Sequence, residues 1–221
     1  MIKRGIIFGD YDTAAKDWTL REWKLAAAEQ ETNFITVPGG IPLDASTVLT
    51  DGEPTYKSRP LTARLERSDG TRLEREALIS EMVNELDGYR LDIVLPDHPA
   101  HYITGRLHVA RDYNDLAHAS VSISATCDPW LYSNTEREYL LTATEAEQVA
   151  QLTNSGRLAV VPVVTVTGEG ANVVLTDGVN SQALSAGTWE LPWLYLRRGF
   201  TYLTYSGSGV VQITYREAVL Q

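Results

Sequence analysis

Histidine is the side chain best suited to proton transfer near neutral pH, and the sequence contains four: His98, His101, His108 and His118. His98 and His101 are separated by two residues, a spacing that could supply half of a metal site. No second pair of histidine or cysteine residues completes such a site, so we favour a polar hairpin turn there. His108 and His118 fall on the polar faces of predicted strands, where contact with solvent accounts for them.

Nucleophiles and acidic clusters give no stronger indication of catalysis. Cys127 ends the apolar face of a predicted strand, where a buried structural thiol is far commoner than a reactive one. Asp10, Asp12 and Asp17 could suggest calcium, but they lack the spacing and the closing glutamate of a calcium loop. The sequence has no phosphate-binding loop and no serine-nucleophile motif. We therefore expect a protein that is not an enzyme and that carries no cofactor or metal.

Aromatic residues are concentrated near the C-terminus, in the order Trp189, Trp193, Tyr195, Phe200, Tyr202, Tyr205 and Tyr215. Exposed rings on a β-sandwich are a common means of stacking on sugars, and Trp189, Trp193, Tyr195 and Tyr202 are the candidates for that role. The alternative is that these rings fill a sandwich core or a subunit contact. We favour the alternative, because their spacing follows strand periodicity.

Charge and length narrow the class of protein further. The chain has 221 residues and a formal net charge of −10, whereas a free-standing nucleic-acid-binding protein would show a basic stripe. A single cysteine allows no disulfide within the chain. The longest apolar runs, such as 160–166, fall well short of the roughly 20 residues of a membrane-spanning helix, so we expect no membrane insertion.

The N-terminal half has the pattern of strands around one helix. Period-2 alternation predicts strands at 59–67, 89–95, 101–111 and 117–127. Residues 73–87 place their apolar side chains at helical spacing, with acidic residues in the first turn and a glycine after the last. A helix packed on antiparallel strands gives a compact α+β unit.

The pattern changes after Pro129. Residues 144–152 are rich in Ala, Glu and Gln and could form a short helix or an exposed turn. From Arg157 onward, short strand-like runs alternate with glycine-containing segments, among them 168–170 and 206–209, which predicts a β-sandwich or jelly roll. We therefore expect a mostly β chain with one main helix, divided into an N-terminal α+β domain at 1–135 and a C-terminal β-sandwich at 136–221.

Residues 34–40 (F-I-T-V-P-G-G) are followed by Leu43-Asp44 and Gly52. In order and spacing, these and other segments resemble the distal tail proteins of long-tailed (siphovirus-type) bacteriophages, which have a similar V-P-G and L-D element. Residues 56–61 (Y-K-S-R-P-L) resemble its tyrosine-to-arginine strand, and residues 125–130 (A-T-C-D-P-W) resemble the close of its ring domain. The resemblance covers nearly the whole chain, although no single motif is specific.

One segment departs from the family pattern. Residues 25–30 could be helical where those proteins usually have a strand. The length matches the short form of the family, without the inserted sugar-binding modules of its extended members.

The resemblance implies a structural hub of the tail tip, or baseplate, of a phage or prophage. The N-terminal domain would form a hexameric ring, and the C-terminal domain would be a galectin-like jelly roll. The ring would join the tail-tube protein to tail-associated or tail-tip proteins, and the genome would pass through its channel without specific recognition. The protein would be assembled in the bacterial cytoplasm and would reside at the tail tip of the virion.

Two sets of candidate binding residues follow. The subunit interface would include a glycine loop and the start of the next strand, with Val37, Pro38, Gly39, Gly40, Tyr56 and Arg59. Glycine there would let a neighbouring backbone approach closely, and the alternative is that the glycines only make a turn within one subunit. The second candidate function is a carbohydrate-binding adhesion module of the tail tip that uses the C-terminal sandwich.

Overall fold

The computed structural model describes residues 5–48 and 53–220, and Gly52 of the family-like segment lies outside the described residues. The chain divides into two compact units, Met1–Leu131 (the N-terminal unit) and Tyr132–Leu220 (the C-terminal unit). The sequence predicts a boundary at 135/136, and this division falls between Leu131 and Tyr132.

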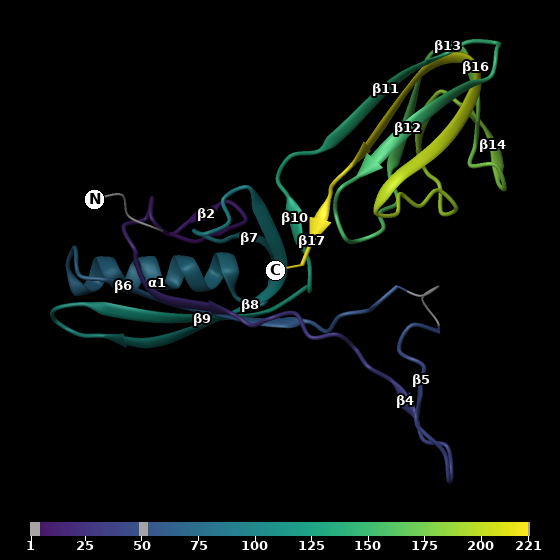
Figure 1. Ribbon diagram of the computed structural model, residues 1–221. Helices are drawn as coiled ribbons and strands as arrows, with labels where there is room; N and C mark the ends of the chain where they lie inside the picture. The colour runs from purple at the N-terminus through teal and green to yellow at the C-terminus, as the bar shows by residue number, and fades with distance from the viewer. Residues whose placement is uncertain (1–4, 49–52, 221) are drawn as a thin grey trace. The chain divides into compact units, whose positions relative to one another are not determined.

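An antiparallel sheet forms the body of the N-terminal unit (Figure 1). Its strands lie in the order β2 (Tyr11–Asp12), β1 (Ile7–Phe8), β7 (Arg90–Val94), β8 (His101–Asn114), β9 (Ala119–Cys127), β6 (Arg59–Arg67) and β3 (Thr19–Leu25). Alternate residues of the central strands are buried, and the register sets them side by side, as in Leu65 opposite Val121 and Val109 opposite Ile123. The predicted strands at 59–67, 101–111 and 117–127 are therefore confirmed, because each buries one face.

Helix α1 (Arg72–Leu86) lies against this sheet (Figure 1) and buries Ile79, Met82 and Leu86. A capping box starts it: the Thr71 N–H donates to Glu74 Oε2 over 2.6 Å, and Thr71 Oγ1 accepts from the Glu74 N–H over 3.3 Å. Gly88 follows at a φ of 80°, which ends the helix as predicted.

Arg75 is a buried charged residue on the same helix. Its guanidinium donates to the carbonyl groups of Gly70 at 2.7 Å, Asp115 at 2.8 Å and Leu116 at 3.2 Å. The side chain thereby fastens the turn before α1 and the loop between β8 and β9 to the helix. Backbone acceptors satisfy a charge that would otherwise be costly to bury.

A two-stranded hairpin leaves the sheet, formed by β4 (Phe34–Ile35) and β5 (Leu43–Asp44) (Figure 1). We call residues 31–48 the arm, because almost all of them are exposed. The helix considered for 25–30 is wrong: Leu25 ends strand β3, and 26–29 have no regular structure. The Ala26 N–H donates to the Pro60 carbonyl at 3.0 Å, so pairing with the sheet overrides the helical propensity of the alanines.

The C-terminal unit is a sheet of long strands. Strand β13 (Val163–Thr176) pairs with residues 204–214 of β16 (Gly199–Tyr215), with a register shift between Thr167 and Asn172. On one side of that shift they are flanked by β11 (Arg137–Ala143) and β15 (Gly187–Glu190). On the other side they are flanked by β12 (Gln148–Asn154) and β14 (Ser181–Ser185). Near the ends of the unit, β10 (Leu131–Ser133) pairs with β17 (Ala218–Val219).

Both halves of this sheet bury one face in a single apolar cluster, which contains Val164 and Ile213 of one half and Leu175 and Leu203 of the other. The sheet therefore folds back on itself at the register shift, and its halves form the two layers of a sandwich. Glycines make this corner possible. Gly207 has a φ of 113°, and a Cβ on it would lie 2.0 Å from the Asn172 carbonyl oxygen.

Two expectations for this unit are wrong. The glycine segments at 168–170 and 206–209 lie inside β13 and β16 instead of separating strands, because the positive φ angles of glycine allow the strands to bend. Of the two alternatives for 144–152, the helix is excluded by β12, which pairs with β16 and buries Ala150 and Leu152, whereas 144–147 form an exposed bend before it. The predicted fold class, mostly β with one main helix, is confirmed for the described residues. Within those residues, no helix has the length and apolar composition needed to cross a bilayer.

Candidate interaction surfaces

The histidines lie in separate structural settings. His98 lies in the turn between β7 and β8 and His101 begins β8, and the His101 N–H donates to the His98 carbonyl at 3.0 Å. His108 Nδ1 lies 2.9 Å from Asp87 Oδ1, and His118 Nδ1 lies 3.6 Å from Asp115 Oδ1. Across residues 5–48 and 53–220, no group of three or more His, Cys, Asp or Glu side chains is arranged to hold a metal ion.

Cys127 is part of the core. Its thiol is buried, and burial raises the pKa of that thiol to about 12, far above the range in which a thiolate acts as a nucleophile. The sulfur fills the space beside Gly105, where an added Cβ would lie 2.6 Å from Sγ. Cys127 therefore has a packing role. Asp12 likewise has a local role, because its Oδ1 accepts the Ala14 N–H at 2.8 Å in a turn.

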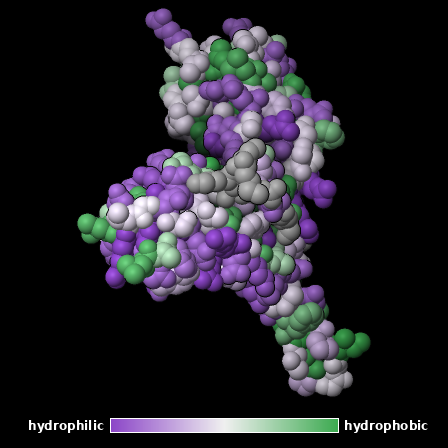
Figure 2. Space-filling view, turned by 90° about the vertical axis from the view of Figure 1, so that its left-hand side faces the viewer, coloured by the Kyte–Doolittle hydropathy of each residue, from purple (hydrophilic) through white to green (hydrophobic). Residues whose placement is uncertain are grey.

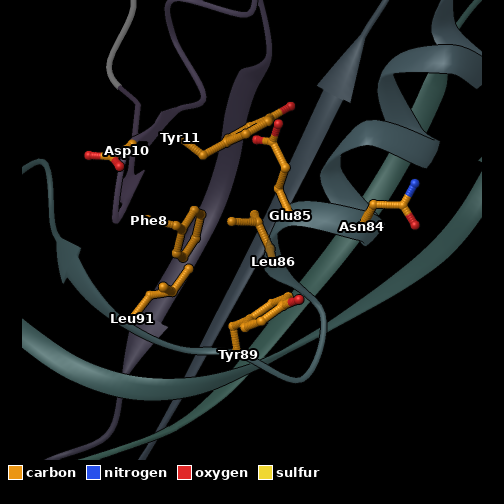
Figure 3. Close-up of a pocket in the computed structure, with 8 residues that line it drawn as sticks. All are labelled: Phe8, Asp10, Tyr11, Asn84, Glu85, Leu86, Tyr89 and Leu91. Carbon is orange, nitrogen blue, oxygen red and sulfur yellow. The ribbon is translucent and has the colours of Figure 1, made fainter.

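A pocket of about 420 Å³ opens between the first hairpin and the end of α1 (Figure 3). Phe8, Leu86 and Leu91 form its floor, and Asp10, Glu85 and Asn84 stand at its rim. Tyr11 also lines the pocket, and burial raises the pKa of its phenol to about 12. The lining residues include no nucleophile paired with a base, so the pocket does not have the arrangement of a catalytic site.

The arm presents the largest group of exposed apolar side chains in the described part of the N-terminal unit. They are Phe34, Ile35, Val37, Ile41, Leu43 and Val48. Figure 2 shows apolar surface on the projecting hairpin, mixed with polar surface. Ile41, at the tip, has 89% of its surface exposed. Groups of exposed apolar side chains are a common feature of interaction surfaces. Within this segment only the turn residues are predicted from the sequence as interface residues, because a β-strand pattern does not reveal which side chains are exposed.

The predicted interface residues divide into two places. Val37, Pro38, Gly39 and Gly40 form a β-turn at the tip of the arm, closed by the Gly40 N–H donating to the Val37 carbonyl at 3.0 Å. Gly39 has a φ of 72°, which the third position of this turn requires. These glycines therefore do make a turn within one subunit, and that turn displays the apolar side chains beside it.

Tyr56 and Arg59 lie at the base of the arm, away from that turn. Tyr56 is half-buried and packs edge-to-face on Trp130, with ring centroids 5.3 Å apart. Arg59 is 3% exposed and donates to the carbonyl groups of Ala26 at 2.7 Å and Pro129 at 3.3 Å. Burial lowers the pKa of its guanidinium. Arg59 therefore donates hydrogen bonds within its own subunit, whereas the sequence predicts it as an exposed residue of the subunit interface.

The C-terminal aromatic residues also divide into two groups. Tyr205 and Tyr215 are buried, and Trp189 and Trp193 pack partly against the core. Tyr195, Phe200 and Tyr202 are exposed by 53%, 65% and 60%. These three rings and Trp193 line a hollow of about 440 Å³, together with Asp177, Leu194, Arg197 and Thr201. We call it the aromatic groove. Of the predicted sugar-stacking residues, Trp193, Tyr195 and Tyr202 line it, and Trp189 does not.

Comparison with known proteins rests on structure. No family model and no curated protein matches the sequence. The structure is similar to the crystal structure of SPP1 Dit (gp 19.1), described as a paradigm of the hub adsorption apparatus in phages that infect Gram-positive bacteria. The TM-score is 0.66 at 16% identity, over 96% of this chain and 98% of that chain. The fold expected from the resemblance to distal tail proteins is thereby confirmed.

Proposed function

We propose that this protein is a structural hub subunit of the tail tip of a long-tailed phage or prophage. The observation that carries the proposal is the likeness to SPP1 Dit along almost the full length of both chains. The finer parts of the proposal are a hexameric ring, its position between the tail tube and the tail-tip proteins, and assembly in the host cytoplasm.

The arm supports the proposal on physical grounds. A two-stranded hairpin is marginally stable by itself in water. This hairpin also exposes apolar residues to water, so it should be stabilised by a partner. In a ring, a neighbouring copy of the chain would be the partner that covers the apolar residues of the arm. Head-to-tail assembly needs two different patches on one subunit. The arm is the first patch, and the second lies on the body of the N-terminal unit.

The charge of the chain is compatible with passage of a genome. DNA carries about one negative charge per 1.7 Å, and it binds proteins largely through phosphate contacts with Lys and Arg. A subunit with a net charge of −10 would line a channel with little attraction for phosphate. A hub of this kind needs no catalytic group.

The decisive experiment compares two substitutions on the full chain. Ile41→Asp places a charge at the tip of the arm, and Val179→Asp places one in the C-terminal unit, in the turn between β13 and β14, where the side chain is 91% exposed. Neither should lower the melting temperature of the subunit, because both side chains already contact water. We expect Ile41→Asp alone to weaken ring formation.

Light scattering and electron micrographs provide the readout, with and without tail-tube and tail-tip partners. A wild-type chain that stays monomeric at high concentration and with both partners overturns the proposal. If Ile41→Asp still forms rings, the arm is not part of the subunit interface, and the proposed hub role is unaffected.

A further inference from the structure

The aromatic groove of the C-terminal unit exposes rings that the fold does not need for its core. Side chains alternate between the two faces of strand β16. Phe200 and Tyr202 therefore point away from the core, and Leu203 and Tyr205 point into it. Tyr195 reaches the same hollow from the loop between β15 and β16. Three large rings therefore share one solvent-facing site, although each would gain free energy by burial.

The backbone under two of the rings, and the ring of Trp193, are held before any ligand arrives. Phe200 lies opposite Thr153 and Tyr202 opposite Gln151 in the β12–β16 ladder, which fixes the backbone beneath both rings. The Trp193 indole N–H donates to Gln182 Oε1 at 3.1 Å, which sets the orientation of that ring. A binding site organised in this way loses little conformational entropy when it is filled.

Polar groups of defined direction stand beside the rings. Asp177 Oδ1 accepts the N–H groups of Asn180 at 2.6 Å and Val179 at 2.8 Å, and Asp177 Oδ2 accepts the Asn180 side-chain amide at 3.1 Å. These hydrogen bonds keep the pKa of Asp177 below its usual range, and they hold the carboxylate in one orientation. Arg197 and the Thr201 hydroxyl add donors on the same lining.

We propose that the aromatic groove binds a pyranose unit of an oligosaccharide. The C–H face of a pyranose ring is apolar and flat enough to lie on an aromatic ring, and its hydroxyl groups both donate and accept hydrogen bonds. Exposed rings with an oriented carboxylate and a guanidinium match both properties. The volume of about 440 Å³ also lies in the range of small-ligand sites, roughly 300–1,000 Å³.

Two other ligand classes fit the groove less well. A nucleic acid would bring phosphates to a lining that contains a carboxylate, on a chain with a net charge of −10. A protein partner buries about 800 Å² per side in a standard interface, a broad area instead of one hollow. The inference stands apart from the hub role, because it concerns the C-terminal unit and not the arm.

The test uses the full chain and named sugars. Maltohexaose, cellohexaose and chitohexaose differ in linkage and in N-acetylation, and polyglycerol phosphate has no pyranose ring. Binding is measured by tryptophan fluorescence, to which Trp193 contributes from within the groove, and by calorimetry. We expect saturable binding of at least one of the three sugars and none of polyglycerol phosphate.

Tyr202→Ala should weaken that binding roughly tenfold or more, a change equivalent to about 1.4 kcal/mol. Tyr89→Ala is the matched control, since Tyr89 is 56% exposed and lies in the other unit. Arg197→Met should weaken binding without removing a ring.

Three outcomes overturn the inference. The first is that none of the three sugars binds at concentrations up to about 1 mM. The second is that wild type and Tyr202→Ala bind sugar equally well. The third is that Tyr202→Ala loses binding to a tail-tip protein and keeps binding to sugar. Ring assembly is scored on the same samples, so failure here is distinguishable from failure of the hub proposal.

Discussion

The phenol rings of Tyr139 and Tyr215 stack in parallel, with centroids 6.3 Å apart and an interplanar angle of 7°. Both hydroxyl groups engage the backbone of Thr153: that of Tyr139 accepts its N–H at 2.9 Å, and that of Tyr215 donates to its carbonyl. Tyr139 and Tyr215 belong to β11 and the adjoining end of β16, and Thr153 belongs to β12. The pair therefore ties one layer of the C-terminal sandwich to the other.

Tyr215→Phe should destabilise the protein by about 1–3 kcal/mol, because the Thr153 carbonyl loses its donor. Thermal unfolding monitored by circular dichroism measures this. The control is Tyr89→Phe, whose hydroxyl belongs to a largely exposed side chain. Equal melting temperatures for wild type and Tyr215→Phe would show that water replaces the phenol without loss.

Gly207→Ala should be far more damaging than Gly170→Ala. Both glycines have positive φ angles, of 113° and 64°, so alanine is strained at either position. Only at Gly207 does the added Cβ meet backbone, 2.0 Å from the Asn172 oxygen, whereas nothing lies within 4 Å at Gly170. We expect the difference in unfolding free energy to exceed about 2 kcal/mol. Similar urea midpoints for the two variants would contradict the close approach at the corner.

Arg75→Met should cost at least about 2 kcal/mol, because it leaves buried carbonyl groups without their charged donor. Arg72→Met is the control, since Arg72 lies on the same helix and is exposed. Urea unfolding compares the two. A loss no larger for Arg75→Met than for Arg72→Met would mean that the guanidinium only fills space.

Acid should weaken the loop between β8 and β9. The N–H groups of His118 and Ala117 bind the carboxylate of Asp115 and lower its pKa below the unfolded value of about 3.9. The resulting stabilisation is complete above that unfolded pKa, and it is lost as pH falls through it toward the folded pKa. The gap in melting temperature between wild type and Asp115→Asn should therefore shrink from pH 5 to pH 3. A gap that stays constant or widens refutes this assignment.

The two domains that we infer, 1–135 and 136–221, should unfold separately. Calorimetry of the full chain should resolve two transitions, because each unit has its own core. Arg75→Met should shift one of them and Tyr215→Phe the other. If both variants shift the same transition, the chain unfolds as a single unit.

The sequence predicts the elements whose pattern is set by one buried face. Strands β6, β8 and β9 alternate along their lengths, and α1 carries both its apolar stripe and its glycine stop, so local sequence suffices. The bends of β13 and β16 could not be predicted in this way. A glycine segment such as 168–170 is compatible with a turn or with a bend, and the choice depends on β16, which lies some forty positions further along the chain.

The candidate sites were predictable only in part. The turn at 37–40 is evident from Pro38 and Gly39, but the exposure of Phe34 and Ile41 depends on how the hairpin leaves the sheet. Arg59 has the appearance of a surface residue in the sequence, and it is buried because backbone carbonyls distant in the chain reach it. Alternation along β16 separates Phe200 and Tyr202 from Leu203 and Tyr205, but which of these two faces is buried depends on how the layers of the sandwich pack.

The unbroken course of β13 and β16 through the corner has a mechanical consequence. In a sandwich of separate sheets, a shearing force can slide one layer over the other by breaking side-chain contacts. Here the same two backbones run through both layers, so sliding must also deform covalent chain at Gly207 and its neighbours. Amide hydrogens in the two layers should then exchange with solvent through one common opening, with similar protection on β11 and β12.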